Sequence, residues 1–466
     1  MIRNALLVNP WIYDFAAYDF WNKPIGLLLL ASLLRKNGLN VHYVDCLDHR
    51  HPELRDQHAP PRPPRRKNNG AGAYLKTPIP APEELKFFPR KYNRYGIAPE
   101  DFLRIVRARP RPDIVMITSM MTYWYPAVFD AITLIRRTFP GIPVVLGGNY
   151  VSLCPQHAAT GAGADYCLEG PAELSIPPFF RDVLHQDLDF WPDPSDLDSL
   201  PYPAFDLIGR PEQVPIMTSR GCPYRCIYCA SPVLNKRFRR RDPIRVAEEI
   251  EFWHSGFGVR NFSFYDDALL VDPEEMAVPL LKELVKRNRP IRFHCPNGLH
   301  LREITPEMSG LLFKAGFKTI RFGFESSDRR FQRTTGGKVD NREFADAVSH
   351  LKRAGYRTSD IGVYLLCGLP GQDAGDVEDS IRFVRSHGAR PIIAEYSPIP
   401  GTALWDAAVA ASPYPIAEEP LYHNNTLLPC RSGNLTYERY QALKLIAAGA
   451  PDPDTCPSPP PPTPSR

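Results

Sequence analysis

Three cysteines stand within eight residues of this chain, at Cys222, Cys226 and Cys229, in the spacing C-x3-C-x2-C. Thiolates are the usual ligands of iron–sulfur clusters, and three of them on one loop can ligate three irons of a 4Fe–4S cube. The fourth iron then has no protein ligand and can bind a substrate or cofactor. Gly221 and Pro223 suit a loop that turns tightly around such a cluster. The sequence therefore predicts a compact cluster-binding loop that the rest of the fold must support.

Two other interpretations of the three thiols are a structural zinc loop and three unrelated buried cysteines. Structural zinc requires four ligands, usually in paired C-x2-C or histidine-containing arrangements. No second pair lies at a suitable distance in this chain. The spacing therefore favours an iron–sulfur cluster.

The cysteine stretch resembles the hallmark of the radical S-adenosylmethionine (SAM) enzymes, which have an aromatic residue just before the last cysteine, here Tyr228. The resemblance implies that the open iron binds the amino and carboxyl groups of SAM. It also implies that an electron from a donor such as flavodoxin or ferredoxin cleaves SAM reductively. The products are methionine and a 5′-deoxyadenosyl radical, which abstracts hydrogen from a small-molecule substrate.

Composition sets the outer bounds on the rest of the chain. Its 466 residues allow two or three domains, and a formal net charge of +4 gives no case for a nucleic-acid partner. Outside the trio, seven cysteines stand singly, as in a reducing compartment, so we expect a cytoplasmic protein. The longest apolar run, residues 24–34, is shorter than the roughly 20 residues that a membrane span needs. It also begins too late for a signal peptide, and we expect a core helix there.

Residues 1–175 alternate strands and helices, and this pattern predicts a doubly wound parallel α/β sheet. Residues 49–98 break the pattern, because they are rich in proline, arginine and histidine, and we expect an insertion or mobile loop there. The expected strands are 5–10, 40–46, 113–119, 143–146 and 165–169, and the expected helices are 24–36, 99–107 and 126–138.

The arrangement resembles the cobalamin-binding domain that precedes the barrel in one large subgroup of radical SAM enzymes. Ligands of such sheets bind at the carboxyl ends of the strands, which makes Ser119, Gly147, Gly148 and Asn149 the candidate cobalamin residues. The D-x-H-x-x-G motif that supplies a histidine to cobalt is absent, since residues 45–51 do not match it. Either cobalamin binds without a protein histidine, or the fold is retained without the cofactor. Bound cobalamin would relay a methyl group; ring formation and oxidative rearrangement are other outcomes in the subgroup.

Residues 176–212 are expected to link the two domains, with Trp191 and Phe205 packed across the seam. From residue 213 to 430 the strand–helix rhythm runs about six times, which predicts a partial (βα)6 barrel with its chemistry at the carboxyl ends of the strands. Residues 431–466 are expected to form a tail that is proline-rich and disordered from about residue 451. The expected barrel strands are 214–218, 261–265, 291–295, 319–324, 358–366 and 391–396.

Several later strand ends resemble family segments that contact SAM. The segment with Asp266 and Asp267 resembles the one that meets the methionine amino group, although Asp267 can equally cap the turn or start a helix. The resemblance further implies SAM contacts by Arg321, Glu325, Ser326 and Gly368. The alternative for Glu325 is a surface salt bridge.

Other polar side chains near strand ends are weaker candidates. Substrate-pocket candidates are His294, Asn297, Tyr364 and Glu395, and a basic cluster at Arg237, Arg239, Arg240 and Arg241 suggests either an anion site or a solvated loop. No residue can be named as catalytic from the sequence.

Two competing functions remain. A methylthiotransferase needs three further cluster cysteines in the first domain, whereas Cys46, Cys154 and Cys167 have the wrong spacing. A non-catalytic iron–sulfur redox or sensor module would also carry the trio, but it need not produce 5′-deoxyadenosine. The sequence does not reveal the substrate, and it predicts a radical SAM enzyme with a 4Fe–4S cluster, SAM and, in one of the two alternatives, cobalamin.

Overall fold

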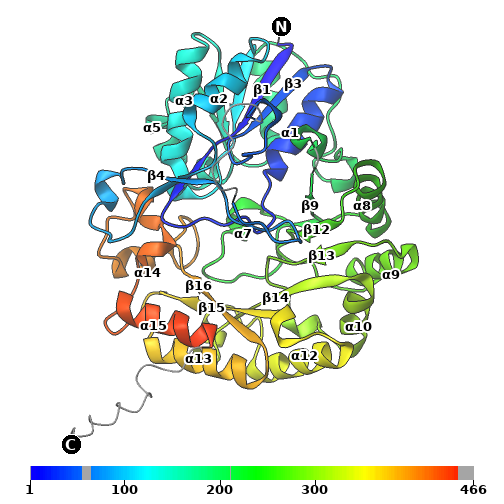
Figure 1. Cartoon of the computed structure of the whole chain (residues 1–466), viewed down its shortest axis with the longest axis vertical. Helices are drawn as coiled ribbons and strands as arrows, with labels where there is room; N and C mark the ends of the chain where they lie inside the picture. The colour runs from blue at the N-terminus through cyan, green and yellow to red at the C-terminus, as the bar shows by residue number, and fades with distance from the viewer. Residues whose placement is uncertain (1, 55–63, 210, 450–466) are drawn as a thin grey trace, which may run out of the picture.

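The computed structural model describes residues 2–54, 64–209 and 211–449, and it shows two α/β units stacked along the long axis of the molecule (Figure 1). The first unit is coloured blue to cyan at the top, and the second, green to orange, lies below it.

The first unit is built on a five-stranded parallel sheet in the order β3-β1-β6-β7-β8. The strand order reverses between β1 and β6, which is the position where doubly wound sheets bind ligands. The central strands are continuous apolar runs, because helices cover both faces of the sheet. The predicted doubly wound sheet is confirmed. Its strands are β1 (Asn4–Asn9), β3 (Asn40–Asp45), β6 (Ile114–Ile117), β7 (Val144–Gly147) and β8 (Tyr166–Leu168).

Helices of the first unit begin close to the carboxyl ends of these strands. The two short helices after β7 were not predicted, because neither is long enough to show an apolar period. The helices are α1 (Ile25–Lys36), α2 (Pro99–Arg107), α3 (Tyr125–Thr138), α4 (Asn149–Leu153), α5 (Pro155–Gly161) and α6 (Ala172–Pro178).

The segment 49–98, expected as an insertion or mobile loop, contains more structure than its composition indicates. Strands β4 (Lys76–Pro78) and β5 (Asn93–Tyr95) join β2 (Ile12–Asp14) in a three-stranded antiparallel sheet. Side chains such as Leu85 are fully buried there. Strands of three residues are too short to show a periodic pattern, and the sequence therefore does not predict them. Residues 55–63 of this segment lie outside the described residues.

The second unit is a six-stranded, all-parallel partial barrel in the order β16-β15-β14-β13-β12-β9. Each strand pairs with the next one along the chain, as the predicted (βα)6 barrel requires. The strands are β9 (Gln213–Ile216), β12 (Asn261–Phe264), β13 (Arg292–His294), β14 (Phe317–Glu325), β15 (Ile361–Cys367) and β16 (Arg390–Glu395).

Helices alternate with the barrel strands and cover their outer face. Several begin at a side-chain cap: Asp242 accepts from two backbone amides of α8, and Asp340 forms a capping box with Glu343 in α12. The helices are α7 (Ser231–Leu234), α8 (Pro243–Phe257), α9 (Ala277–Arg287), α10 (Pro306–Ala315), α11 (Arg329–Thr334), α12 (Asn341–Ala354), α13 (Ala374–Ser386) and α14 (Trp405–Ala411).

The expectation of a tail from residue 431 is wrong for its first part. Helix α15 (Tyr437–Ala448) packs against α13 and β16 and buries Tyr440, Leu443 and Ile446. Its apolar residues are spread around the helix instead of gathering on one face, so tertiary packing rather than an amphipathic pattern decides the fold here. The expected disorder from about residue 451 falls outside the described residues.

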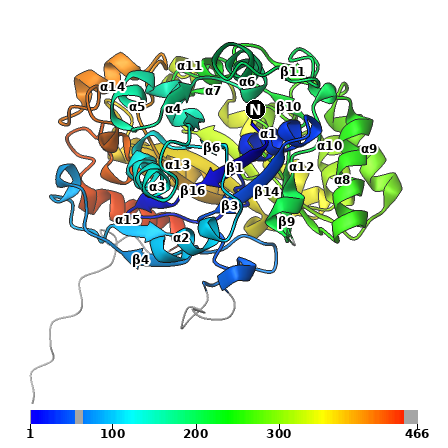
Figure 2. The ribbon, with the colours of Figure 1, turned by 90° about the horizontal axis from the view of Figure 1, so that it is seen from above.

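The two units share one continuous apolar core. The backbone amide of Ala204, in the connecting segment, donates to the carbonyl of Leu28 in α1 at 3.0 Å. The next residue, Phe205, is fully buried and packs edge-on against Trp253 of α8, with ring centroids 5.4 Å apart. Seen from above, the first unit covers the middle of the barrel (Figure 2). Within the described residues, no helix combines the length and the apolar character needed to span a membrane.

Candidate functional site

The three cysteines lie on the loop that follows the first barrel strand and ends at α7. Gly221 adopts φ +80°, and a Cβ there would lie 2.8 Å from the carbonyl oxygen of Arg237, so only glycine fits. Inside the loop, the amide of Cys229 donates to the carbonyl of Cys226 at 3.1 Å. The amide of Ser231 donates to the sulfur of Cys229 at 3.4 Å. The loop therefore curls tightly, as predicted.

The donor set fits a cluster better than a single metal ion. All three thiols are half-buried, and burial raises the pKa of Cys222 and raises that of Cys229 to about 11. Iron would replace the thiol protons, because a coordinating thiol is deprotonated. Among the described residues, no three His, Cys, Asp or Glu side chains converge on one ion. Three thiols that ligate different corners of a cube need not converge, whereas zinc ligands must.

Asp266 holds the start of the cluster loop instead of facing a ligand. Its Oδ1 accepts from the amide and hydroxyl of Thr218, at 2.8 and 2.7 Å, and from the amide and hydroxyl of Ser219, at 2.6 and 2.8 Å. Its Oδ2 is buried and has no partner among the described residues. Burial raises the pKa of Asp266 to about 6, against those four hydrogen bonds, which lower it. The predicted SAM contact of Asp266 is thus replaced by a structural role.

Asp267, by contrast, is exposed and points toward the cluster loop. Its Oδ2 accepts from the hydroxyl of Ser231 at 2.6 Å, two residues after the last cysteine. The alternative that Asp267 caps a helix is not seen, since its carboxylate binds the loop. Asp267 remains available to a ligand at the cluster.

Glu325 stands at the end of β14 in the left-handed region, with φ 69°. Such a conformation is strained for a residue with a side chain and is kept where the surrounding structure enforces it. The Tyr228 hydroxyl donates to the Glu325 carboxylate, and Lys338 lies 3.8 Å from it. Burial raises the pKa of Glu325, and Lys338 opposes the rise. The strained strand end therefore delivers Glu325 to the cluster loop.

Ser326, the next residue, turns away from the loop. The residue is 2% exposed, and its hydroxyl lies 3.3 Å from the Ser380 hydroxyl on α13 and accepts from the amide of Asp328 at 3.1 Å. The placement of Ser326 therefore does not support its predicted contact with SAM, because its hydroxyl is engaged by Ser380 and by the backbone of Asp328.

Arg321 and Gly368 occupy the neighbouring strands. The Arg321 side chain lies over Gly362 and beside Tyr364, and burial lowers the pKa of its guanidinium. Gly368 has φ +92°, and its amide donates to the Gln372 side chain at 2.8 Å. A Cβ on Gly368 would lie 3.1 Å from the side chain of Leu428. The Leu428 side chain therefore covers the turn at Gly368.

The four candidate cobalamin residues lie together at the carboxyl ends of β6 and β7. The Ser119 hydroxyl donates to the Gly147 carbonyl at 2.7 Å, and the Asn149 amide donates to the Ser119 carbonyl at 2.9 Å. Gly148 has φ +100°, and a Cβ there would lie 2.2 Å from the Ser119 carbonyl oxygen. The glycine is therefore required for the two strand ends to meet.

A cavity of about 510 Å³ lies between the carboxyl ends of β6 and β7 and the cluster loop. Gly147, Gly148 and Asn149 line it from the first unit, and the cluster loop lines it with Cys229 and Ser231. Asp267 also reaches it, whereas Glu325 and Arg321 do not line it. The carboxyl end of β7 in the first unit and the last cluster cysteine therefore line the same cavity.

The walls of this cavity combine apolar side chains with polar groups, as a large ligand such as cobalamin requires. Apolar side chains of α1, β6, β7 and α6 line the cavity, and glycines bring the backbone close. None of the lining residues is a histidine, which agrees with the missing D-x-H-x-x-G motif. The cavity therefore fits the alternative in which cobalamin binds without a protein histidine.

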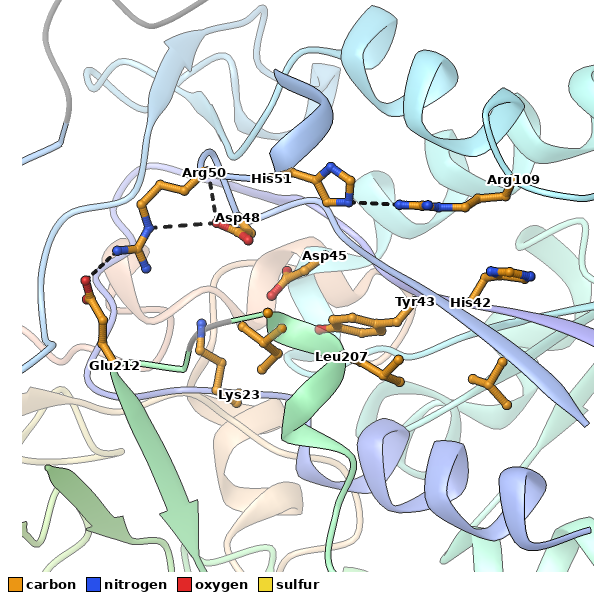
Figure 3. A pocket seen from close by; sticks show the side chains of 13 residues that line it. Lys23, His42, Tyr43, Asp45, Asp48, Arg50, His51, Arg109, Leu207 and Glu212 are labelled. Carbon is orange, nitrogen blue, oxygen red and sulfur yellow. Dashed lines mark hydrogen bonds and ion pairs between the residues drawn. The ribbon is translucent and has the colours of Figure 1, made fainter. Parts of the chain in front are cut away.

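A second cavity, of about 850 Å³, lies beside β3 and contains none of the candidate site residues (Figure 3). Both of its arginines are in ion pairs: Arg50 lies 2.6 Å from Glu212, which also lines the cavity, and Arg109 lies 2.9 Å from Glu53 outside it. We therefore assign the chemistry to the cavity between the units.

Three of the four arginines in the basic cluster after the cysteines have protein partners: Arg239 donates to the carbonyl of Pro194, and Arg240 and Arg241 form ion pairs. Arg240 pairs with Asp272 and Glu275, and Arg241 pairs with Asp198 and Glu249. These side chains fasten the β10–β11 hairpin (Ser219–Arg220 and Arg239–Arg240) to its surroundings. An anion site at this cluster is therefore not supported.

Sequence reasoning missed Ser231 and Lys338. Ser231 follows the last cysteine by two residues. The sequence analysis identifies its partner Asp267 as a candidate, but it does not predict the hydrogen bond between them. Lys338 lies in a glycine-containing loop after α11, where no strand-end rule applies. Contacts of this kind depend on how the segments fold together, so one sequence does not reveal them.

Comparisons with known proteins agree with this geometry. The family model described as the radical SAM superfamily matches residues 216–384, and the model described as the B12 binding domain matches residues 91–178. An uncharacterized methyltransferase of Pyrococcus horikoshii is 25% identical over 333 residues, which are 64% of this chain and 70% of that protein. A bacteriochlorophyllide d C-8(2)-methyltransferase of Chlorobaculum tepidum is 26% identical over 291 residues, or 57% of this chain and 62% of that one.

A solved structure shares the fold of both units. The radical S-adenosylmethionine methyltransferase TsrM of Kitasatospora setae superimposes with a TM-score of 0.63 and 18% identity. The match covers 88% of this chain and 77% of that chain.

Proposed function

Since the chain belongs to the radical SAM superfamily and carries a B12-binding domain ahead of its barrel, we propose that it is a cobalamin-dependent radical SAM methyltransferase. One observation carries this proposal. A single cavity of about 510 Å³ is lined both by the strand ends of the first unit and by Cys229 and Ser231 of the cluster loop. A methyl carrier in the first unit and a SAM-binding cluster in the second would therefore share one space.

In this proposal Cys222, Cys226 and Cys229 hold the cluster, with Asp267 and Glu325 beside it. When bound, the cluster and cobalamin supply an electron for SAM cleavage and a carrier for its methyl group. The protein's own part is to place the groups and to exclude water. The four hydrogen bonds to Asp266 fix the loop start, and the Tyr228–Glu325 contact fixes its end. SAM-contacting roles for Tyr228, Asp267, Arg321, Glu325 and Gly368 remain part of the proposal.

Cobalamin is proposed to bind at Ser119, Gly147, Gly148 and Asn149 and to extend between the apolar walls of the cavity. Gly147, Gly148 and Asn149 line the cavity, and Ser119 holds them in place through its hydrogen bonds to Gly147 and Asn149.

We propose a small molecule as the methyl acceptor, because a relative with a stated substrate is named for a small organic ring compound, bacteriochlorophyllide. The electron donor is proposed to be a flavodoxin or ferredoxin in the cytoplasm. The nine described cysteines are all free, which supports a reducing compartment.

An anaerobic turnover experiment tests the proposal. The protein is reconstituted with iron, sulfide and hydroxocobalamin, reduced with dithionite and incubated with SAM. We expect SAM to be consumed, with S-adenosylhomocysteine or 5′-deoxyadenosine as products, and no consumption in Cys226→Ala. A reconstituted protein that holds the cluster but leaves SAM intact would instead be the iron–sulfur sensor.

The methylthiotransferase alternative is not supported by the structure. It needs three cluster cysteines in the first unit, and Cys46 is fully buried while Cys154 and Cys167 are half-buried on other elements.

A further inference from the structure

A basic groove of about 480 Å³ lies between α11 and the start of α12, outside the cavity described above. Four arginines line it: Arg302, Arg329, Arg333 and Arg342. None of them contributes to the proposed binding of the cluster, SAM or cobalamin. The groove is therefore a charged surface that the proposed function leaves unexplained.

The positive charge of this groove is only partly neutralised. Arg302 lies 2.7 Å from Glu343, and Arg342, with a side chain 92% exposed, lies 3.9 Å from Asp346. Arg329 and Arg333 are exposed and form no ion pair with any described residue. The acidic residue in the groove, Asp340, is occupied by capping α12. Uncompensated surface charge of one sign attracts a partner of the opposite sign over a distance set by the salt concentration.

The groove shares a wall with the cluster loop. Gly337 lines the groove, and its carbonyl accepts from Arg302 at 3.3 Å. At the preceding residue, Gly336, a Cβ would lie 3.4 Å from the Cα and 3.6 Å from the sulfur of Cys226. One residue therefore separates the groove from a cluster ligand.

A second contact ties the same wall to the loop. Tyr224, between the first two cysteines, stacks on His300 with ring centroids 4.4 Å apart and an interplanar angle of 25°. His300 is buried and stands two residues before Arg302. A partner bound in the groove would therefore be linked to the cluster loop by two short contacts, Gly336 with Cys226 and His300 with Tyr224.

We propose that this groove is the docking surface for an acidic one-electron carrier protein that reduces the cluster, an inference that rests on the proposed function. In this step one electron leaves the reduced carrier and enters the cluster, and no bond or proton changes place. A protein fits better than a small anion, because the arginines spread along an open surface and are exposed. Complementary charge on exposed rims governs the encounter of two proteins.

The test compares two charge-reversed variants of the holoenzyme. In the groove variant, Arg329→Glu and Arg333→Glu change two unpaired arginines. In the control, Arg107→Glu and Arg137→Glu make the same change of charge on α2 and α3 of the first unit, where both residues are exposed. Binding of purified flavodoxin and of purified ferredoxin is measured by titration at low salt, and cluster reduction by each carrier is followed by stopped-flow absorption.

We expect the groove variant to bind at least one carrier tenfold or more weakly, with a smaller salt dependence, while the control stays within twofold of wild type. Equal carrier binding by both variants, or no binding by the wild-type protein, would overturn the docking proposal. Dithionite needs no docking surface, so the groove variant should cleave SAM at the wild-type rate with dithionite. If wild-type protein cannot cleave SAM with dithionite, the proposed function fails. The carrier-binding measurement decides the docking proposal separately.

Discussion

Trp21 of the first unit stacks on His294 of the barrel, with ring centroids 4.4 Å apart and the rings 11° from parallel. His294 uses both ring nitrogens, one 3.0 Å from the Thr319 hydroxyl and one 3.3 Å from the Asn261 side chain. Burial lowers the pKa of His294 to about 3, so the ring is neutral at physiological pH. His294, a substrate-pocket candidate from the sequence, is therefore a packed residue under a tryptophan.

Replacing Trp21 by alanine should destabilise the contact between the units. Trp21 is 3% exposed and its indole nitrogen donates to the Asn69 carbonyl at 2.6 Å. Removing a buried aromatic side chain costs about 3–5 kcal/mol. We expect a loss of that size in the free energy of unfolding, measured by urea denaturation with circular dichroism. Trp21→Phe should keep most of the stack and lose about 1 kcal/mol with the hydrogen bond; equal losses in both variants would disprove the role of the stack.

Adjacent residues Glu325 and Ser326 should behave differently. Glu325→Gln removes the charge beside Tyr228 and Lys338, and we expect SAM affinity to fall about tenfold, or about 1.4 kcal/mol, with unchanged iron content. Ser326→Ala should leave SAM affinity within twofold, because the hydroxyl faces Ser380. Equilibrium dialysis with labelled SAM on reconstituted protein measures both. If the serine variant were the weaker binder, the orientation of this strand end in solution would differ from the one described.

Asp266 should make stability depend on pH. Folding raises the pKa of Asp266 from 3.8 to about 6, so the folded state binds its proton more tightly than the unfolded state does. The resulting contribution to the free energy of unfolding is fully present below pH 4 and is lost as the pH rises through 6. Compared with Asp266→Asn, wild-type protein should lose about 2 kcal/mol of unfolding free energy between pH 4.5 and 7.5. Urea titrations of both proteins across this range provide the measurement. Parallel pH profiles would show that the carboxyl is ionised throughout.

Gly148 and Gly147 form a matched pair at the proposed cobalamin site. Gly148→Ala places a Cβ 2.2 Å from the Ser119 carbonyl oxygen at a positive φ, which we expect to cost about 2–3 kcal/mol and to abolish cobalamin uptake. At Gly147 the nearest atom to a new Cβ is the Leu168 carbonyl oxygen at 3.6 Å, an ordinary contact, so Gly147→Ala should fold normally. Thermal melting and the absorption of bound cobalamin report the two effects. Normal cobalamin uptake by Gly148→Ala would argue against this site.

Much of the fold follows from local pattern. The apolar runs of β1 and β6 and the strand–helix rhythm of the barrel were visible because they repeat. The three strands of the β2-β5-β4 sheet were not, since three residues show no period. Helix α15 was missed because its packing against α13 and β16 decides its structure.

The site divides in the same way. Cys222, Cys226 and Cys229 were identified because their chemistry is encoded in their spacing. Which of Asp266 and Asp267 faces the cluster could not be told, because both follow the same strand and only tertiary contacts separate them. The fate of Ser326 likewise depends on Ser380, 54 residues away.

The central claim is that three thiols on a barrel loop hold a 4Fe–4S cluster whose open iron binds SAM. Electron paramagnetic resonance of the anaerobically reconstituted, dithionite-reduced protein, recorded with and without SAM, tests it most directly. We predict the signal of a reduced 4Fe–4S cluster that changes shape when SAM is added and is absent from Cys226→Ala. A protein without a cluster signal, or with a signal that SAM leaves unchanged, would contradict the account.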